Sequence, residues 1–378
     1  MDFDLSEEQV AFRGTARDYL AQRWPLDAMR TALDNPPAVF PADLWSEIAG
    51  LGWLGVGVPE EWGGSGADLV TVAVLCEEAG RGLLPGPFLS AVSAVTAWAR
   101  LLERSAVEPL LADLATGEQR ATPAFEEVAG GLGGPLATTA SSTGHGWVLS
   151  GTKILVPDGE GADVLLVTAA AADGPALFAV PARSAGVVKA PLRRLDAQAL
   201  SEVILEEVWL PVEARVGGDG DGAAAVSRGL DVCSVLLAAD LLGTASRVLE
   251  MTTQYATERI QFDRPIGTFQ AVSHRLADVA VDVEIGRSLI YGACLALDEG
   301  HAEGPALASA SKAWMGDAAV RAAESAVQIH GGIGYTWELD VHLFLRRARA
   351  NAVTLGDPDD HRDRVASLLE AGSSVGPA

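Results

Sequence analysis

The sequence predicts an α+β multidomain protein in which a β domain lies between two helical domains. Residues 1–120 have helical periodicity, residues 121–217 read as short strands separated by turns, and residues 218–378 are helical again. The chain has 378 residues, enough for two or three domains with large cores. We therefore expect domains at 1–120, 121–217 and 218–378, and we find no internal repeat.

The N-terminal region is expected to be a set of amphipathic helices. Ser6 stands ahead of a glutamate-rich first turn, which is typical of a helix N-cap. Leu5, Phe12 and Tyr19 recur two turns apart and can therefore share one apolar face. Further helices are expected within residues 40–52, 68–82, 91–105 and 106–119.

The middle region has the pattern of a small β domain. Between residues 137 and 170 three strand-like runs alternate with turn signals at residues 142–146, at Gly151 and at residues 158–161. Residues 176–191 and 201–211 continue the pattern, and a glycine- and aspartate-rich linker follows at residues 217–222.

The C-terminal region is organised around residues 229–270. Its first thirty or so residues form one long apolar helix, rich in Ala and Leu and free of proline. Pro265 and Gly267 end the helical pattern in a polar loop. Further helices with short connections predict an antiparallel bundle, and they are expected at residues 269–300, 305–332, 340–355 and 359–369.

Charge and cysteine content bear on the class of protein and on its partners. With 27 Lys and Arg against 51 Asp and Glu, the net charge is -24, which argues against a nucleic-acid partner. A phosphate-bearing cofactor remains possible, because a few local arginines suffice to bind it. Three cysteines match no metal-ligand spacing and fit a reducing cytoplasm, and we expect neither a signal peptide nor a membrane span.

Two stretches could bind a nucleotide. Arg259, Phe262 and Gln270 follow the long helix and offer a cation, a stacking face and an amide donor, although Arg259 could equally be a surface residue paired with Glu258. The glycine-rich residues 328–336 allow close approach of a ligand to the backbone, although most such turns simply end helices. This stretch does not match the Rossmann fingerprint, and we interpret its His330 as structural.

One acid could act as a base. Asp240 lies in the middle of the long helix, flanked by Leu and Ala, and burial there would raise the pKa of its carboxyl towards that of a general base. The alternative is a core acid that is simply paired or solvated.

The chain resembles the acyl-CoA dehydrogenases over nearly all of its length. The resemblance is carried by residues 59–66, 150–167, 208–217, 255–278 and 326–338, of which the last two segments together are the most specific. It implies an N-terminal helical domain, a middle β-barrel or sandwich domain and a C-terminal four-helix bundle. It also implies FAD, a dimer-of-dimers assembly, and an electron-transfer flavoprotein or similar electron acceptor.

The resemblance also assigns roles to residues. Arg259 and Phe262 are similar in position to residues that meet the FAD pyrophosphate and adenine, and Gln270 lies in the same segment. Gln328, Gly331 and Gly332 match residues that reach the adenosine part of a neighbouring subunit's FAD. The implied reaction is removal of the α proton of an acyl-CoA thioester with transfer of the β hydride to flavin N5, which gives the 2,3-enoyl-CoA of lipid metabolism.

Departures from the family pattern bear on this reaction. Leu355 stands where many members have the catalytic Glu, and Cys233 stands where others carry it. Asp240 lies seven residues after Cys233, about 10 Å along the same helical face, and is the expected base. Leu155 and Pro157 replace the usual Trp and Thr beside the flavin.

These departures leave three readings open. The first is a self-sufficient FAD-dependent acyl-CoA dehydrogenase that forms a homotetramer. The second is a non-catalytic subunit that completes the FAD site of an α2β2 heterotetramer, as in members that act on CoA esters of steroids and other bulky acids. The third is a flavin oxidase or monooxygenase of the same fold. Neither chain length nor steroid character of the acyl group follows from the sequence.

Overall fold

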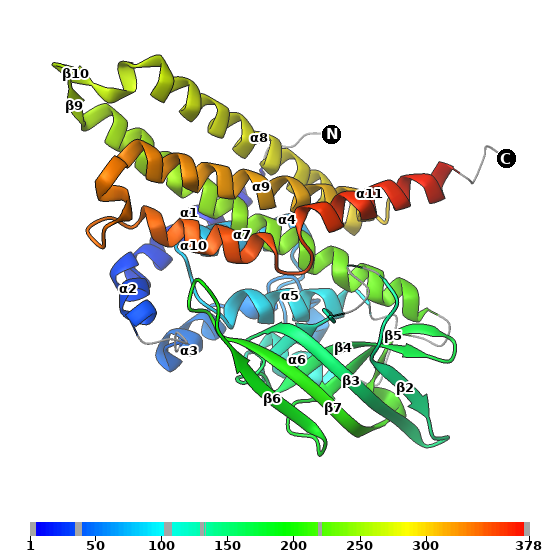
Figure 1. Ribbon diagram of the computed structural model, residues 1–378. Helices are drawn as coiled ribbons and strands as arrows, with labels where there is room; N and C mark the ends of the chain where they lie inside the picture. The colour runs from blue at the N-terminus through cyan, green and yellow to red at the C-terminus, as the bar shows by residue number, and fades with distance from the viewer. Residues whose placement is uncertain are drawn as a thin grey trace.

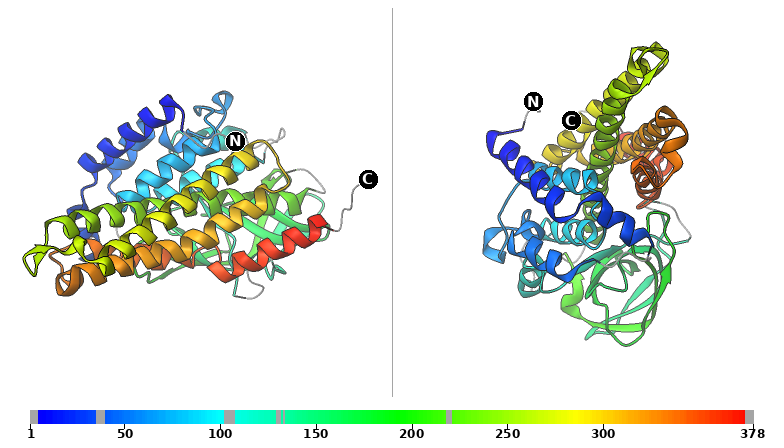
Figure 2. Two further views of the ribbon diagram at one scale, coloured as in Figure 1. Left: turned by 90° about the horizontal axis from the view of Figure 1, so that it is seen from above. Right: turned by 90° about the vertical axis from the view of Figure 1, so that its left-hand side faces the viewer.

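The computed structural model describes residues 5–34, 40–101, 108–128, 132, 134–217 and 221–373. It has the predicted α+β architecture, with helices at both ends of the chain and one β-sheet in the middle (Figure 1). The sheet lies at one side of the molecule, and the long helices α7 and α8 project away from it to the far side (Figures 1 and 2).

The N-terminal helices form where the sequence predicts them, except α2, which was not predicted from the sequence. Ser6 caps α1 in a capping box with Gln9, and Leu5, Phe12 and Tyr19 all pack against the main core. The Asp68 side chain caps α4 by accepting a hydrogen bond from the Thr71 N–H. The helices of this region are α1 Glu7–Arg23, α2 Leu26–Asp34, α3 Ala42–Gly50, α4 Leu69–Arg81, α5 Phe88–Ala99 and α6 Glu108–Ala115.

The middle region is one curved eight-stranded sheet (Figure 2). Its order is β6-β7-β3-β2-β4-β5-β8, with β1 pairing in parallel with β4. The strands are β1 Ala121–Ala124, β2 Thr139–Ser142, β3 Gly146–Pro157, β4 Val164–Ala171, β5 Gly174–Pro181, β6 Val187–Leu192, β7 Leu200–Pro211 and β8 Arg215–Val216.

The sequence interpretation of Gly151 as a turn is wrong. Gly151 lies inside β3, where the register with β7 shifts between Leu149 and Gly151. Its φ is +153°, and a Cβ there would lie 2.5 Å from Thr138. A bulge inside a strand and a turn both favour glycine, so the sequence signal is the same for the two.

The C-terminal helices are α7 Gly222–Glu258, α8 Gln270–Asp298, α9 Gly304–His330, α10 Val341–Ala352 and α11 Pro358–Ser373. Helix α7 begins seven residues before the predicted start at Gly229 and ends close to the predicted loop. That loop is a tight hairpin, β9 Ile260–Gln261 and β10 Arg264–Pro265, with Phe262 and Asp263 at positive φ in its turn. Helices α10 and α11 pack against α9.

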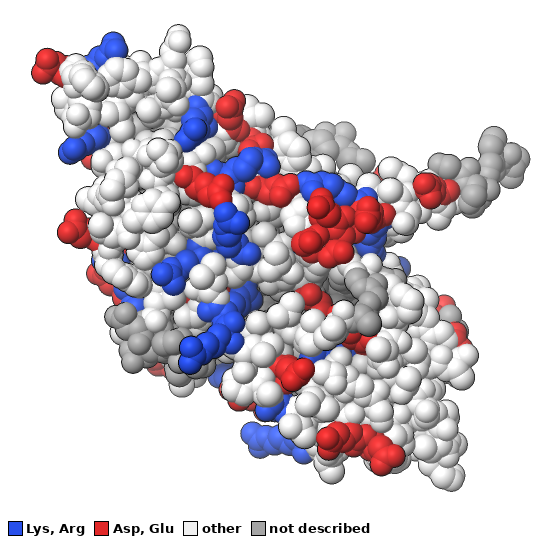
Figure 3. All heavy atoms as spheres, viewed as in Figure 1, with Lys and Arg blue, Asp and Glu red and all other residues white. Residues whose placement is uncertain are grey.

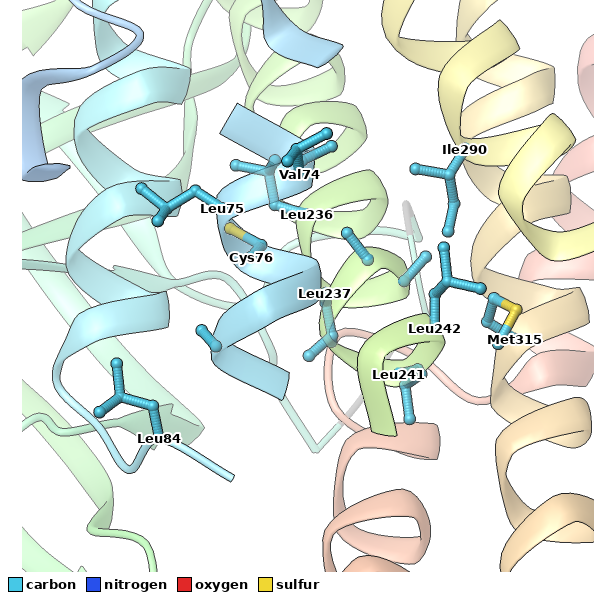
Figure 4. Packing of buried hydrophobic residues seen from close by; sticks show 14 of the residues in the cluster. Val74, Leu75, Cys76, Leu84, Leu236, Leu237, Leu241, Leu242, Ile290 and Met315 are labelled. Atoms are coloured by element: carbon cyan, nitrogen blue, oxygen red, sulfur yellow. The ribbon is translucent and has the colours of Figure 1, made fainter. Parts of the chain in front are cut away.

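The core lies where α4 crosses α7. Leu236, Leu237, Leu241 and Leu242 of α7 pack among side chains of α4, α8 and α9 (Figure 4). The two backbones nearly touch, since a Cβ on Gly80 would lie 2.0 Å from the Asp240 carbonyl oxygen and one on Gly243 would lie 1.8 Å from that of Glu77. Glycine is therefore required on both helices at this crossing.

Among the described helices, α7 alone is long and apolar enough to cross a membrane by length and composition. Its most apolar 18-residue window is 89% buried inside the protein, as expected of a core helix.

Candidate active site

Asp240 lies in the interior, where α7 meets α10. Its side chain is 1% exposed, and both carboxylate oxygens have partners on α10. Oδ2 lies 3.1 Å from Arg347 Nη1, and Oδ1 accepts a 2.6 Å hydrogen bond from Asn351 Nδ2. Burial raises the pKa of Asp240, while the Arg347 charge and the Asn351 hydrogen bond oppose that rise.

Arg347 links the three parts of the chain. Its guanidinium also lies 3.2 Å from Asp196 in the segment between β6 and β7, and it donates to the carbonyls of Leu83 and Leu84, which follow α4. Arg194 lies 2.8 Å from Asp196 and also contacts Asn351. The Asp240 carboxylate is thus part of a buried charge network that joins the bundle, the β domain and the N-terminal helices.

A cavity of about 230 Å³ lies between the β domain and the bundle. Phe125, Leu230 and Leu355 supply apolar walls, and Glu126 supplies a carboxylate. The Glu126 Oε1 accepts a 2.7 Å hydrogen bond from the Leu355 N–H. Burial raises the pKa of Glu126 to about 7, so this carboxyl titrates close to neutral pH.

The turn that carries Leu355 is held by buried polar side chains. Leu355 has φ +57°, which is uncommon for a residue other than glycine. Lys312 Nζ donates to the carbonyls of Ala352 and Gly356, and His361 Nε2 lies 2.9 Å from the Leu355 carbonyl oxygen. Burial lowers the pKa of Lys312 to about 7 and that of His361 to about 3. The turn is therefore fixed from α9, α11 and the β domain together.

The predicted cofactor residues gather at the far end of the bundle. Phe262 is 84% exposed at the tip of the β9–β10 hairpin, and Arg259 and Gln270 are exposed on either side of it. Phe262 and Gln328 line one open groove of about 820 Å³, together with the exposed Arg275. Glu258 accepts a hydrogen bond from Gln254, and no ion pair is found for Arg259 among the described residues.

The glycines beside this groove leave the backbone open. A Cβ built on Gly331 or Gly332 would meet no atom within 4 Å, and Gly331 has φ +67°. His330 is buried, stacks on Tyr255 with ring centroids 4.2 Å apart, and places Nδ1 2.8 Å from the Ala326 carbonyl oxygen. Burial lowers the pKa of His330, which agrees with a structural, neutral imidazole.

The cavity and the hairpin end lie far apart. Leu230 of the cavity and Glu258 at the end of α7 are 28 residues apart, about 42 Å along the helix axis. Figure 1 shows the same separation, with the hairpin at one end of the molecule and the sheet at the other. One extended dinucleotide is too short to reach both places in a single chain.

Comparison with known proteins identifies the family. The model of the acyl-CoA dehydrogenase N-terminal domain matches residues 6–120, and that of the C-terminal domain matches residues 220–369. An acyl-CoA dehydrogenase of Bacillus subtilis (strain 168) is 31% identical over 382 residues, which cover 98% of this chain and 100% of that protein. The chain belongs to the acyl-CoA dehydrogenase family.

Solved structures agree along the whole chain. A variant of the steroid ACAD Tcur3481–Tcur3483 matches with a TM-score of 0.90 and 34% identity over 97% of this chain and 99% of that one. The ChsE4–ChsE5 complex from Mycobacterium tuberculosis matches with a TM-score of 0.87 and 28% identity over the full length of both chains. PigA, solved with FAD and proline, matches with a TM-score of 0.88 and 26% identity over 98% and 99%.

FAD is the cofactor of this family, and the protein is accordingly an FAD-dependent acyl-CoA dehydrogenase. The residues at the hairpin end fit FAD, because they offer an exposed cation, an exposed aromatic ring and open glycine backbone. On the β domain Pro157 has no N–H to donate to a flavin ring.

Sequence reasoning did not single out Glu126, Lys312 or His361. Glu126 and Leu355 are 229 residues apart, so no local pattern connects them. The paired glutamates in the run Phe125–Glu126–Glu127 are a weak signal, because adjacent acids are common on surfaces.

Proposed function

We propose that the protein removes the α and β hydrogens of an acyl-CoA thioester and forms the 2,3-enoyl-CoA. The observation that carries this proposal is the cavity beside Leu355, where the β domain and the bundle enclose apolar walls and a carboxylate. The protein would polarise and orient the thioester and accept the α proton, and bound FAD would supply the hydride acceptor. We further propose that the protein is cytoplasmic and that an electron-transfer flavoprotein is its electron acceptor.

The cofactor-binding roles are part of the same proposal. Arg259 would pair with the FAD pyrophosphate, and Phe262 would pack on its adenine side. Gln270 would donate beside them, while Gln328, Gly331 and Gly332 would contact the adenosine part of a neighbouring subunit's FAD. Their exposure and the absence of side chains on the two glycines support these roles.

Asp240 is the proton acceptor that the sequence predicts, and its role is testable. To accept a proton it would have to release Arg347 or Asn351, which hold both of its oxygens. If Asp240 is the base, Asp240→Asn should abolish turnover while FAD stays bound. Retained turnover would leave Asp240 as a structural partner of Arg347.

The test of the proposed function is the visible spectrum of the chain purified alone. A flavin band that bleaches under anaerobic conditions with octanoyl-CoA or a steroid-acid CoA thioester supports a self-sufficient dehydrogenase. A flavin band that none of the thioesters bleaches contradicts the proposal. Bleaching followed by rapid reoxidation in air would favour an oxidase of the same fold.

A second candidate is a subunit of a heterotetramer. Two matching structures are named as pairs of proteins, which favours this candidate. The roughly 42 Å that separates the cavity from the hairpin end favours an FAD that touches two chains, which fits like and unlike chains equally. Under this reading the chain is colourless alone and acquires FAD when mixed with a second acyl-CoA dehydrogenase chain. FAD bound by a homotetramer of this chain would exclude that reading.

A further inference from the structure

Glu126 is fixed at both its backbone and its side chain. It follows β1, and its carbonyl oxygen accepts a 2.9 Å hydrogen bond from the Ile154 N–H of β3. Its side chain reaches across to the bundle, where the Leu355 N–H donates to Oε1. A carboxylate held in this way has a defined direction, which a general base requires.

The surroundings of Glu126 differ from those of a structural ion pair. Lys312 of α9 and Arg194 before β7 favour the carboxylate electrostatically, and Asp360 of α11 opposes it. Neither Lys312 nor Arg194 forms an ion pair with Glu126: Lys312 donates to backbone carbonyls and Arg194 pairs with Asp196. Within the described residues the Leu355 N–H gives this carboxylate its hydrogen bond, so Oε2 is open to the cavity. Burial is the largest influence and raises its pKa to about 7.

The other buried acids nearby are committed to protein partners. Glu127 forms an ion pair with Lys153 and also accepts hydrogen bonds from the N–H groups of Ala137 and Thr138. Asp158 accepts from Ser90 beside a cavity of only about 30 Å³. Asp240 is held by α10. Asp360, which also lines the cavity, accepts a hydrogen bond from the Asp357 N–H. Glu126 therefore differs from these acids in having a carboxylate oxygen that faces the cavity without a protein partner among the described residues.

We propose that Glu126 is the residue that accepts the α proton of the acyl thioester. This inference rests on the proposed function and names the base of the same site. The C–H bond at the α carbon breaks, its proton moves to the Glu126 carboxylate, and its electron pair forms the new carbon–carbon double bond. Bound FAD would supply the acceptor for the hydride from the β carbon, which balances the electrons.

Proton abstraction can be measured without oxidation. The chain is incubated in water with octanoyl-CoA deuterated at its α carbon, or with a similarly labelled steroid-acid CoA thioester, and deuterium loss is followed by mass spectrometry. The wild type should wash out the label, and Glu126→Gln should do so at least ~100-fold more slowly, the typical contribution of a general base. Asp240→Asn should change the rate less than ~10-fold, and the exposed Glu206→Gln serves as the matched control.

The pH dependence separates a base from a structural role. Only the deprotonated carboxylate accepts a proton, so wild-type exchange should rise with pH and level off above about 7. Glu126→Gln keeps an acceptor for the Leu355 N–H and should lose this rise. Glu126→Asp keeps the charge, so its exchange should still increase with pH but at a lower rate. This variant also provides the test if Glu126→Gln does not fold.

The outcomes separate this inference from the proposed function. Exchange that Glu126→Gln leaves within ~3-fold of wild type overturns Glu126 even if the flavin bleaches with substrate. Loss of exchange in an Asp240→Asn protein that is still folded by circular dichroism, with Glu126→Gln at the wild-type rate, assigns the base to Asp240 and overturns Glu126. Exchange that depends on Glu126 in a chain whose flavin no thioester bleaches supports Glu126 and overturns the oxidation. No exchange with either thioester overturns Glu126 as well.

Discussion

Candidate functional side chains are buried in the middle of α7 and exposed at its end. In the middle, Asp240 is 1% exposed and both of its oxygens have partners within the chain. At the end, Arg259 and Phe262 extend from a hairpin into solvent. Asp240 in the middle of α7 thus stabilises the fold, whereas Arg259 and Phe262 at its end are available to a ligand or a second chain. Burial alone does not identify a catalytic acid, because Asp240 is fully buried and has partners on both oxygens, whereas Glu126 is only partly buried.

The largest effect is expected from Asp240→Ala. It would leave the buried Arg347 with Asp196 as its remaining acidic partner, and breaking a buried pair costs about 3–5 kcal/mol in free energy of unfolding. Urea denaturation measures this loss. Asp18→Ala, at an exposed site on α1, should stay within about 0.5 kcal/mol of wild type. A loss below about 1 kcal/mol in Asp240→Ala would mean that the network is not tightly coupled to the fold.

A smaller effect, and one on binding alone, is expected from Arg259→Gln. Removal of a charge-assisted hydrogen bond to the pyrophosphate should cost about 1.5–3 kcal/mol of FAD affinity, which is ~10- to 150-fold in Kd. The unfolding midpoint of the FAD-free protein should not change, because Arg259 is exposed. Fluorescence titration with FAD measures the affinity, and the exposed Arg183→Gln on the β domain is the control. Equal affinities in the two variants would remove Arg259 from the cofactor site.

The smallest effect is expected from Phe262→Ala. The ring is 84% exposed and makes an edge contact with Phe269, so its loss should change the free energy of unfolding by less than about 1 kcal/mol. If it packs on the adenine side, FAD affinity should fall by about 1 kcal/mol, roughly 5-fold. FAD and FMN titrations of the same variant test this, because FMN lacks the adenine. A similar loss for both flavins would place Phe262 elsewhere.

The fold was largely predictable because its signals are local. The periodicity of Leu5, Phe12 and Tyr19 and the cap at Ser6 each depend on a few neighbouring residues, and both are confirmed. The apolar run of α7 predicts a core helix for the same reason. The β9–β10 hairpin was missed because its turn residues, Phe262 and Asp263, are not the Asn-Gly or Gly-rich pair that usually indicates such a turn.

The site was only partly predictable because its contacts are distant in sequence. Asp240 was noticed as an acid among leucines, yet Arg347 lies 107 residues away and its partnership could not be read from either helix alone. Glu126 and Leu355 meet only when the β domain docks on the bundle. The net charge of the chain also did not predict where charged side chains lie. Acidic and basic side chains are interspersed over one face, and acidic ones gather near the start of α11 (Figure 3).

The glycine crossing of α4 and α7 limits how the molecule can move. A screw motion of either helix by one residue, which combines a shift of about 1.5 Å with a rotation of about 100°, would bring the side chain of Ala79 or Arg81, or of Leu242 or Thr244, into a space that admits no Cβ. The N-terminal helices and the bundle are therefore expected to behave mechanically as a single rigid block. The β domain is tied to that block by the Arg347–Asp196 pair and by the hydrogen bond from the Leu355 N–H to Glu126, so the walls of the cavity are expected to keep their spacing as the molecule moves.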